Sequence, residues 1–375
     1  MGGINFSDNI HARGRNLHLQ TNTLEDEKKI ISTLFDGGRV LCKEVGFYTS
    51  SHLMDPLKKE IEAFHSKKIE EIELLYAISA KVKTVRHPLS LNTLGLQFLK
   101  WNLLDEAISE FELAIQYNPH YGEAYLNLGE AYLRRGGLSE AEQYLRKGVQ
   151  AVSIYADMWQ KLGRVHSVQG QYKKAVDAFQ NALKINPSYD EAHFAMAMCL
   201  VEVLLKSIQT KGLPNGETCR NQAREHLSRA AAISSRFREP EFEEAMRMFH
   251  RGELNRTLEL LRKVDEDLPK IIDLSFHDAF YLKYMFGEEG RDAKSIQEYI
   301  RQLETLIEEH PKFPDLHNKL GVAYFIQCRV LFNKALYELN KACEIHPEYG
   351  RAKNNLKLAK NESKGLLILL RSLLK

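Results

Sequence analysis

The chain has 375 residues, of which 44% are hydrophobic and 27% are charged. These proportions are typical of an ordinary soluble protein. Because 52 Lys and Arg residues are balanced by 50 Asp and Glu residues, the formal charge is only +2. No global field therefore attracts nucleic acid or an anionic membrane, and we expect no nucleic-acid partner.

Cysteine usage and the chain start indicate the cellular compartment. The five cysteines are scattered without a C-x-x-C pair, which argues against a disulfide framework and a zinc knuckle. The opening residues, MGGINFSDNIHARG, lack the apolar segment of a secretory signal. No run approaches the roughly 18 apolar residues that span a bilayer. The sequence predicts a cytoplasmic protein without a transmembrane segment.

Residues 1–51 are predicted to form a small β-hairpin module. Leu17–Thr21 alternates apolar and polar residues, as does Ile30–Leu34, and Asp36-Gly37-Gly38 is a hairpin signal. We expect about three strands, which are too few for an independent core. The sheet should therefore lean on the helices that follow it.

Residues 52–87 are predicted to form one long connecting helix. Asp55-Pro56 places a capping carboxylate before a proline at the first helical position. Two sets of apolar residues with helical spacing follow, out of phase with each other: Leu57, Ile61 and Phe64, then Ile69, Ile72 and Tyr76. We expect a helix of about 25 residues that leads to the next segment.

From residue 88 the sequence has a 34-residue period. Gly95, Gly129 and Gly163 follow one another at this spacing, and each precedes an alanine by the same interval. Small residues at these positions let two antiparallel helices approach closely, while a Phe or Leu one turn after the alanine fills the space beside them. Pro119 and Pro187 cannot continue a helix and mark the loop to the next copy. Three copies are predicted, at 88–121, 122–155 and 156–189.

These residues resemble the tetratricopeptide repeat (TPR) family. The third copy has nearly all of the family's signature residues, namely Trp159, Leu162, Gly163, Ala175, Phe179, Ala182 and Pro187. The resemblance implies a mostly α fold, in which an α-α superhelical solenoid follows the small N-terminal β module. It also implies a function in protein–protein interaction.

After residue 189 the repeat is interrupted. Ala197 stands at the glycine position of a fourth copy, but 14 residues are inserted before its second helix, and Thr210–Thr218 has the Gly, Pro and Asn of a loop. A pair of helices turning at Gly252, a degenerate pair and a recovered repeat at Pro314–Pro347 are predicted next. The expected organisation is a β module at 1–51, a connecting helix at 52–87, three repeats and the first helix of a fourth at 88–207, an insertion loop and divergent repeats at 208–269, a degenerate and a recovered repeat at 270–349, and capping helices at 350–375.

No motif for catalysis, cofactor binding or metal binding is found. The sequence has no phosphate-binding P-loop, no G-x-G-x-x-G after a strand, no H-E-x-x-H and no G-x-S-x-G. The histidines are spread out, and the carboxylate-rich stretches have the spacing of solvated helix faces. We therefore expect a protein that is not an enzyme and that has no cofactor and no metal.

The family resemblance implies a concave groove whose ligand contacts come from fixed positions on the first helix of each repeat. In this sequence these positions hold Asn92, Leu96, Leu99, Lys100, Leu126, Asn127, Glu130, Leu133, Arg134, Gln160, Lys161, Arg164, Phe194 and Met198. The apolar members suit apolar anchors, Asn127 suits a peptide backbone, and Lys161 and Arg164 suit an acidic side chain. The alternative is that other parts of the chain cover the apolar positions.

The sequence thus predicts an adaptor or scaffold that holds a partner peptide or helix in the groove. A regulatory or docking subunit of a larger enzyme complex and a self-assembling scaffold are the alternatives. The run Gly365–Leu370 is too apolar for a solvated helix and too short to span a membrane. It either caps the last repeat or joins copies of the chain into a homo-oligomer through this C-terminal helix.

Overall fold

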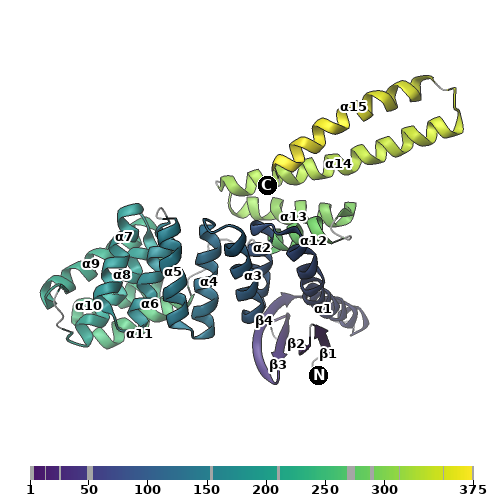
Figure 1. Cartoon of the computed structure of the whole chain (residues 1–375). Coiled ribbons are helices and arrows are strands. Elements are labelled where there is room, and N and C mark those ends of the chain that lie inside the picture. Colours follow the sequence, from purple (N-terminus) through teal and green to yellow (C-terminus); the bar gives the residue numbers. More distant parts are fainter. Residues whose placement is uncertain are drawn as a thin grey trace. The chain divides into compact units, whose positions relative to one another are not determined.

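The computed structural model describes residues 4–12, 14–24, 27–48, 54–152, 155–208, 212–267, 275–287, 291–311, 313–348 and 350–373, without the side chains of residues 54, 267, 361–364 and 366–373. The chain forms two compact units, Met1–Ser275 and Phe276–Lys375. The predicted fold class is confirmed, because the described residues are mostly helical and a small antiparallel sheet lies at the N-terminal end (Figure 1).

The sheet is an antiparallel meander of four strands in chain order: β1 (Asn5–Ala12), β2 (Arg15–Leu24), β3 (Lys29–Asp36) and β4 (Arg39–Phe47). The prediction of about three strands is wrong because β1 is mostly polar. Only Ile10 and Ala12 of β1 are buried, while most of its other side chains are exposed. A small apolar cluster that includes Ile30 and Ile61 joins the sheet to the first helix.

That helix, α1 (Met54–Val85), has 32 residues and is longer than predicted. Its two apolar sets pack on different partners, which explains why they are out of phase. Ile61 belongs to the cluster beneath the sheet. Tyr76 lies with its ring centroid 5.4 Å from that of Phe98 in the next helix. The helix thereby joins the sheet to the repeats.

The three repeats form helix pairs α2 (Pro88–Lys100) with α3 (Leu104–Tyr117), α4 (Gly122–Arg135) with α5 (Leu138–Ala151), and α6 (Ala156–Val168) with α7 (Tyr172–Ile185). A Cβ atom on Gly163 would lie 2.5 Å from the ring of Phe179, so glycine is required where these helices cross. The turn inside each pair uses a residue with positive φ, at Asn102, Gly136 and Gly170, which keep the spacing of the repeat.

The first unit continues with α8 (Asp190–Leu205), α9 (Gly216–Ile233), the short 3-10 helix η1 (Ser235–Arg238), α10 (Pro240–Arg251) and α11 (Leu254–Asp267). The loop predicted at Thr210–Thr218 is shorter than expected, because Asn215 caps α9 and Gly216 already begins it; residues 210 and 211 lie outside the described residues. Helix α8 packs against α6, α7 and α9, and α11 also packs against α8.

The second unit contains α12 (Ser275–Phe286), α13 (Ala293–Glu309), α14 (Pro314–Ile345) and α15 (Gly350–Leu373). The repeat predicted at Pro314–Pro347 is wrong, because α14 is one continuous helix of 32 residues. Cys328 stands seven residues after Gly321, where the true repeats have Asn102, Gly136 or Gly170 with positive φ. A cysteine adopts that conformation at a steric cost, so the helix continues.

Helices α14 and α15 pack side by side as a hairpin, which we call the arm (Figure 1). The backbone of Gly365–Leu370 is helical and belongs to α15. Beyond Gly365 the side chains of this run lie outside the described residues. The capping and homo-oligomer predictions for this run therefore stay predictions.

Candidate protein-binding surface

Helices α2, α4, α6 and α8 contact one another in succession and form what we call the inner row (Figure 1). The predicted site residues occur on this row at equivalent places. Asn92, Leu126, Gln160 and Phe194, for example, keep the spacing of the repeat and come from four successive helices. The 34-residue register therefore determines which side chains are neighbours along the row.

The apolar positions of α2 and α4 differ in their accessibility. Leu96, Leu126 and Leu133 are half-buried, so part of each side chain is open to a ligand. Leu99 is only 6% exposed and belongs to the core. The sequence prediction of Leu99 as an anchor is therefore corrected, because its side chain packs between helices.

The polar positions hold neighbouring helices together. Asn127 donates a hydrogen bond from Nδ2 to Oδ1 of Asn92, at 2.9 Å, and so joins α4 to α2. Asn92 is 2% exposed and Gln160 is 3% exposed, so neither has the accessibility that a ligand contact needs. Asn127 is half-buried and remains at the edge of the row.

Glu130 is the centre of an ion-pair network on the row. Lys161 Nζ lies 2.7 Å from one of its carboxylate oxygens, and Arg134 Nε lies 3.0 Å from the other. Burial by itself would raise the pKa of Glu130, but the two cations outweigh it and lower the pKa to about 2. Lys161 is thus already paired with a carboxylate of its own chain at neutral pH.

Arg164 forms a second link, from α6 to α11. Its Nη1 donates to Oδ1 of Asp265 at 2.9 Å, and its Nη2 donates to Oδ2, although the two residues are 101 positions apart. Burial would lower the pKa of Arg164, but the Asp265 carboxylate more than compensates and raises it. This bidentate pair fixes α11 beside the α8 end of the inner row.

Phe194 is not available to a ligand, which corrects its prediction as an anchor. It is 1% exposed, and its ring stacks on Phe237 of η1 with centroids 4.8 Å apart. Phe242 of α10 lies against the same ring at 6.3 Å. Met198 is half-buried against the same core cluster. At this end the predicted groove residues are covered by the segments that follow α8.

The structure adds Val168, which the sequence reasoning missed. This last residue of α6 is 68% exposed, and it stands in the 34-residue register of Lys100 and Arg134. The 34-residue spacing from Lys100 and Arg134 would have been sufficient to predict Val168 as a site residue. Lys100 itself lies toward the sheet, with Nζ 3.7 Å from Oε2 of Glu44. Leu96, Leu126, Leu133 and Val168 are thus accessible apolar residues of α2, α4 and α6.

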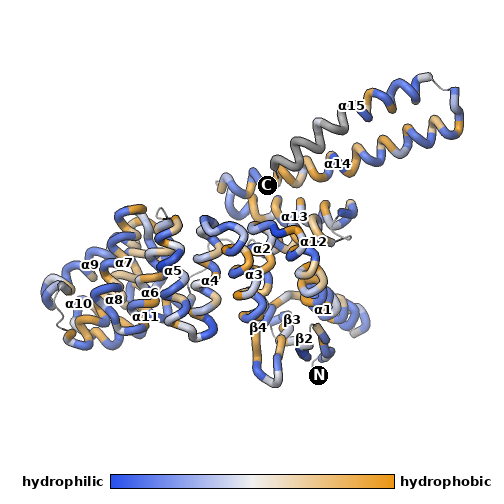
Figure 2. Tube along the Cα trace, viewed as in Figure 1, coloured by the Kyte–Doolittle hydropathy of each residue, from blue (hydrophilic) through white to orange (hydrophobic). Residues whose placement is uncertain are grey.

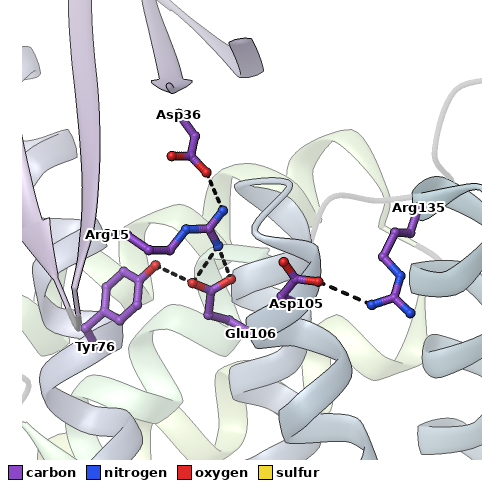
Figure 3. Close-up of polar contacts among 6 residues, drawn as sticks. All are labelled: Arg15, Asp36, Tyr76, Asp105, Glu106 and Arg135. Atoms are coloured by element: carbon purple, nitrogen blue, oxygen red, sulfur yellow. Dashed lines mark hydrogen bonds and ion pairs between the residues drawn. The ribbon is translucent and has the colours of Figure 1, made fainter. Parts of the chain in front are cut away.

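The sheet is attached to the first repeat by a compact polar cluster (Figure 3). Arg15 Nη1 donates to both carboxylate oxygens of Glu106, at 2.7 and 2.6 Å, and Nη2 donates to Asp36 at 2.5 Å. Tyr76 donates its hydroxyl to Glu106 at 2.8 Å. The cluster ties β2, the end of β3, α1 and α3 into one unit.

Two further findings concern only the described residues. Among them, no group of three or more His, Cys, Asp or Glu side chains is placed to hold a metal ion. None of the helices, over the part of the chain that was searched, is both long and apolar enough to cross a membrane.

Comparison with known proteins identifies the repeats. Residues 102–160 and 156–189 match family models described as "Tetratricopeptide repeat". "Protein bimA" of Emericella nidulans is 33% identical over 84 residues, which cover 22% of this chain and 10% of that protein. "Superkiller complex protein 3" of Homo sapiens is 29% identical over 143 residues, which cover 36% of this chain and 9% of that protein.

This chain thus matches only about a tenth of the length of these two relatives. Among solved structures, the crystal structure of MamA superposes with a TM-score of 0.37 and 21% identity, and the match covers 48% of this chain and 96% of that chain. The two family models together assign residues 102–189, in the central part of the chain, to tetratricopeptide repeats.

Proposed function

We propose that this chain, a protein with tetratricopeptide repeats, is a non-catalytic adaptor that binds a peptide or helix of a partner protein along its inner row. The observation that carries the proposal is the accessible apolar group on α2, α4 and α6. Leu96, Leu126 and Leu133 are half-buried and Val168 is 68% exposed. Apolar side chains on a protein surface are common anchors for a bound peptide or helix.

The charges of the row favour apolar recognition over an acidic clamp. Lys161 is engaged by Glu130, and Arg164 is engaged by Asp265. An acidic ligand would have to displace one of these carboxylates, whereas an apolar ligand side chain can pack on the leucines without breaking an ion pair. Burying one such side chain stabilises a complex by about 1.5–3 kcal/mol.

Helix α11 limits the length of the binding surface. It packs against α8, and its Asp265 reaches across to Arg164. We therefore place the ligand along α2, α4 and α6, and not along all four helices of the row. Asn127, at the edge of this surface, has the hydrogen-bonding groups to bind a peptide backbone.

The alternatives drawn from the sequence would use the same surface differently. In a docking subunit the ligand is a segment of an enzyme, and in a self-assembling scaffold it is a segment of another copy. The scaffold role, the cytoplasmic location and a homo-oligomer through the C-terminal helix stay proposals. The ligand's identity distinguishes these cases, because each predicts a different protein bound to Leu126 and Leu133.

A pull-down from cells that express the chain tests the proposal. Leu126→Asp and Leu133→Asp place a charge among the anchors, and the matched control is Ile185→Asp, which changes a 40% exposed apolar residue of α7. We expect the wild type and the control to recover the same partner and the two row variants to lose it. Equal recovery by all four proteins, each with an unchanged circular dichroism spectrum, would refute binding through the row.

A further inference from the structure

Helix α14 presents a second apolar surface, which is made of other residues than the inner row. Steps of four and three residues connect its members, which we call the outer seam: Tyr324, Cys328, Leu331, Ala335, Glu338, Ala342 and Ile345. All are apolar except Glu338, and apolar residues recur along α14 in Figure 2. This alternating spacing is the pattern of a coiled-coil seam, which packs against another helix.

The outer seam is open in the second unit. Tyr324 is 46% exposed, although its hydroxyl donates a hydrogen bond to Glu304 of α13 at 2.7 Å. Leu331 is 59% exposed and Ile345 is 77% exposed. A different stripe of α14, with Phe332, Leu336 and Leu339, is half-buried, as expected where α15 packs on α14. The arm therefore uses one stripe of α14 internally and leaves a second one, of three heptads, exposed at every position except the half-buried Ala342.

The charges beside the seam define what it can bind. Lys334 and Lys341 are exposed and lie along one border of the seam, seven residues apart, while Glu338 lies within it. Among the described residues none of these three has an ion-pair partner, although Lys341 Nζ lies 5.9 Å from the ring centroid of Tyr337. A matching surface needs acidic groups opposite the two lysines and a basic group opposite Glu338.

A second copy of the arm does not meet this requirement. In a parallel pairing Glu338 would face the same carboxylate of the other copy. In an antiparallel pairing that aligns the apolar positions, the twofold axis lies near Ala335, and Lys334 would face its own counterpart. Like charges oppose each other in both arrangements, which disfavours self-association through this seam.

We propose that the outer seam is a docking site for an amphipathic helix of a different protein, with an apolar three-four repeat, acidic residues along the border that meets Lys334 and Lys341, and a basic residue opposite Glu338. The outer seam consists of residues of the second unit, whereas the inner row consists of residues of the first.

Two designed peptides test the charge pattern on the full chain. The first has leucine at each seam position, glutamate along both borders and one lysine placed opposite Glu338. The second is the same peptide with glutamate and lysine exchanged. We expect fluorescence anisotropy to show that the first peptide binds at least about tenfold more tightly, because three charge contacts change sign between the two peptides.

Two variants of similar exposure locate the binding surface. Leu331→Ser should weaken the first peptide by about tenfold or more, since it removes a buried apolar contact. Leu358→Ser makes the same change at a 65% exposed leucine of α15 and should leave the affinity unchanged. For Glu338→Lys, binding should be lost and then restored by a peptide with glutamate opposite that position.

Four outcomes would overturn the proposal. Equal binding of the two peptides would refute the charge pattern, and equal effects of the Leu331 and Leu358 variants would refute the location. A doubled mass in sedimentation that Leu331→Ser abolishes would show a second copy on the seam. Binding to vesicles of phosphatidylserine and phosphatidylcholine that Leu331→Ser abolishes, without peptide binding, would show a membrane surface instead.

Discussion

Arg15 of β2 holds both carboxylate oxygens of Glu106 of α3, at 2.7 and 2.6 Å (Figure 3). The side chains of Arg15 and Glu106 are 28% and 15% exposed. The preceding residue, Asp105, binds Arg135 at 3.2 Å, but there the side chains are 72% and 40% exposed. Two neighbouring carboxylates of one helix thus make ion pairs of very different burial.

Removing the half-buried guanidinium of Arg15 should destabilise the first unit. We expect Arg15→Met to lower the free energy of unfolding by about 2 kcal/mol, because Glu106 and Asp36 lose charge-assisted hydrogen bonds. Arg135→Met is the control and should change it by no more than about 0.5 kcal/mol, since exposed pairs contribute little. Urea denaturation followed by circular dichroism measures both. Equal losses would show that burial does not distinguish the two pairs.

Two glycines at the same position of the repeat pattern should respond in opposite directions. Gly163→Ala places a Cβ atom 2.5 Å from the Phe179 ring and should destabilise by about 1–2 kcal/mol. A Cβ atom on Gly321 would have no neighbour within 4 Å, so Gly321→Ala should stabilise α14 by about 0.5–1 kcal/mol. Thermal unfolding of the two variants measures this. A destabilised Gly321→Ala would indicate that a second helix crosses there after all.

We expect two histidines to make the stability of the first unit depend on pH. His193 of α8 and His226 of α9 have their Nδ1 atoms 2.7 Å apart, and His193 Nε2 donates to the carbonyl of Pro187. Because its Nε2 carries the proton, His193 accepts at Nδ1 the Nδ1 proton of His226, and a proton added to His193 Nδ1 would break this bond. Burial lowers the pKa of His193, and burial together with His193 lowers the pKa of His226 from 6.5 to about 4.

The sign of the effect follows from these shifts. Below pH 6.5 the unfolded chain binds protons that the folded pair does not, so stability falls as the pH drops from 6.5 toward 4. The slope contributed by His226 is at most about 1.4 kcal/mol per pH unit. We expect His226→Gln to flatten this part of the curve of unfolding free energy against pH. An unchanged slope would mean that the pair does not titrate on unfolding.

The sequence was sufficient to predict the repeats because their determinants are local. Gly95 and Gly163 mark the helix crossings, and the 34-residue period places each helix pair without any knowledge of distant contacts. A local residue also explains why Pro314–Pro347 does not form a repeat. Cys328 occupies the position at which Gly136 and Gly170 adopt positive φ and end the helix. The residue at this turn position predicts whether a helix pair forms better than the glycine at position 321 does.

The rest of the candidate site depends on contacts that no local pattern reveals. Arg164 meets Asp265 across 101 residues, and Phe194 is covered by Phe237 and Phe242 after an irregular insertion. The position of a residue in the repeat predicts the helix and the face on which it lies. It does not predict whether later segments of the chain cover that residue. Such contacts depend on tertiary packing, and they decide which predicted groove residues remain accessible.

Site-specific photo-crosslinking tests binding along the inner row most directly. A photoreactive residue at Val168, which is 68% exposed on α6, is compared with the same residue at Ile185, which is 40% exposed on α7. We predict that, in cells, the residue at 168 captures one protein whose crosslink maps to a segment with apolar anchors, and that the residue at 185 does not capture it. Capture of the same protein from both positions, or from 185 alone, would contradict binding in the row.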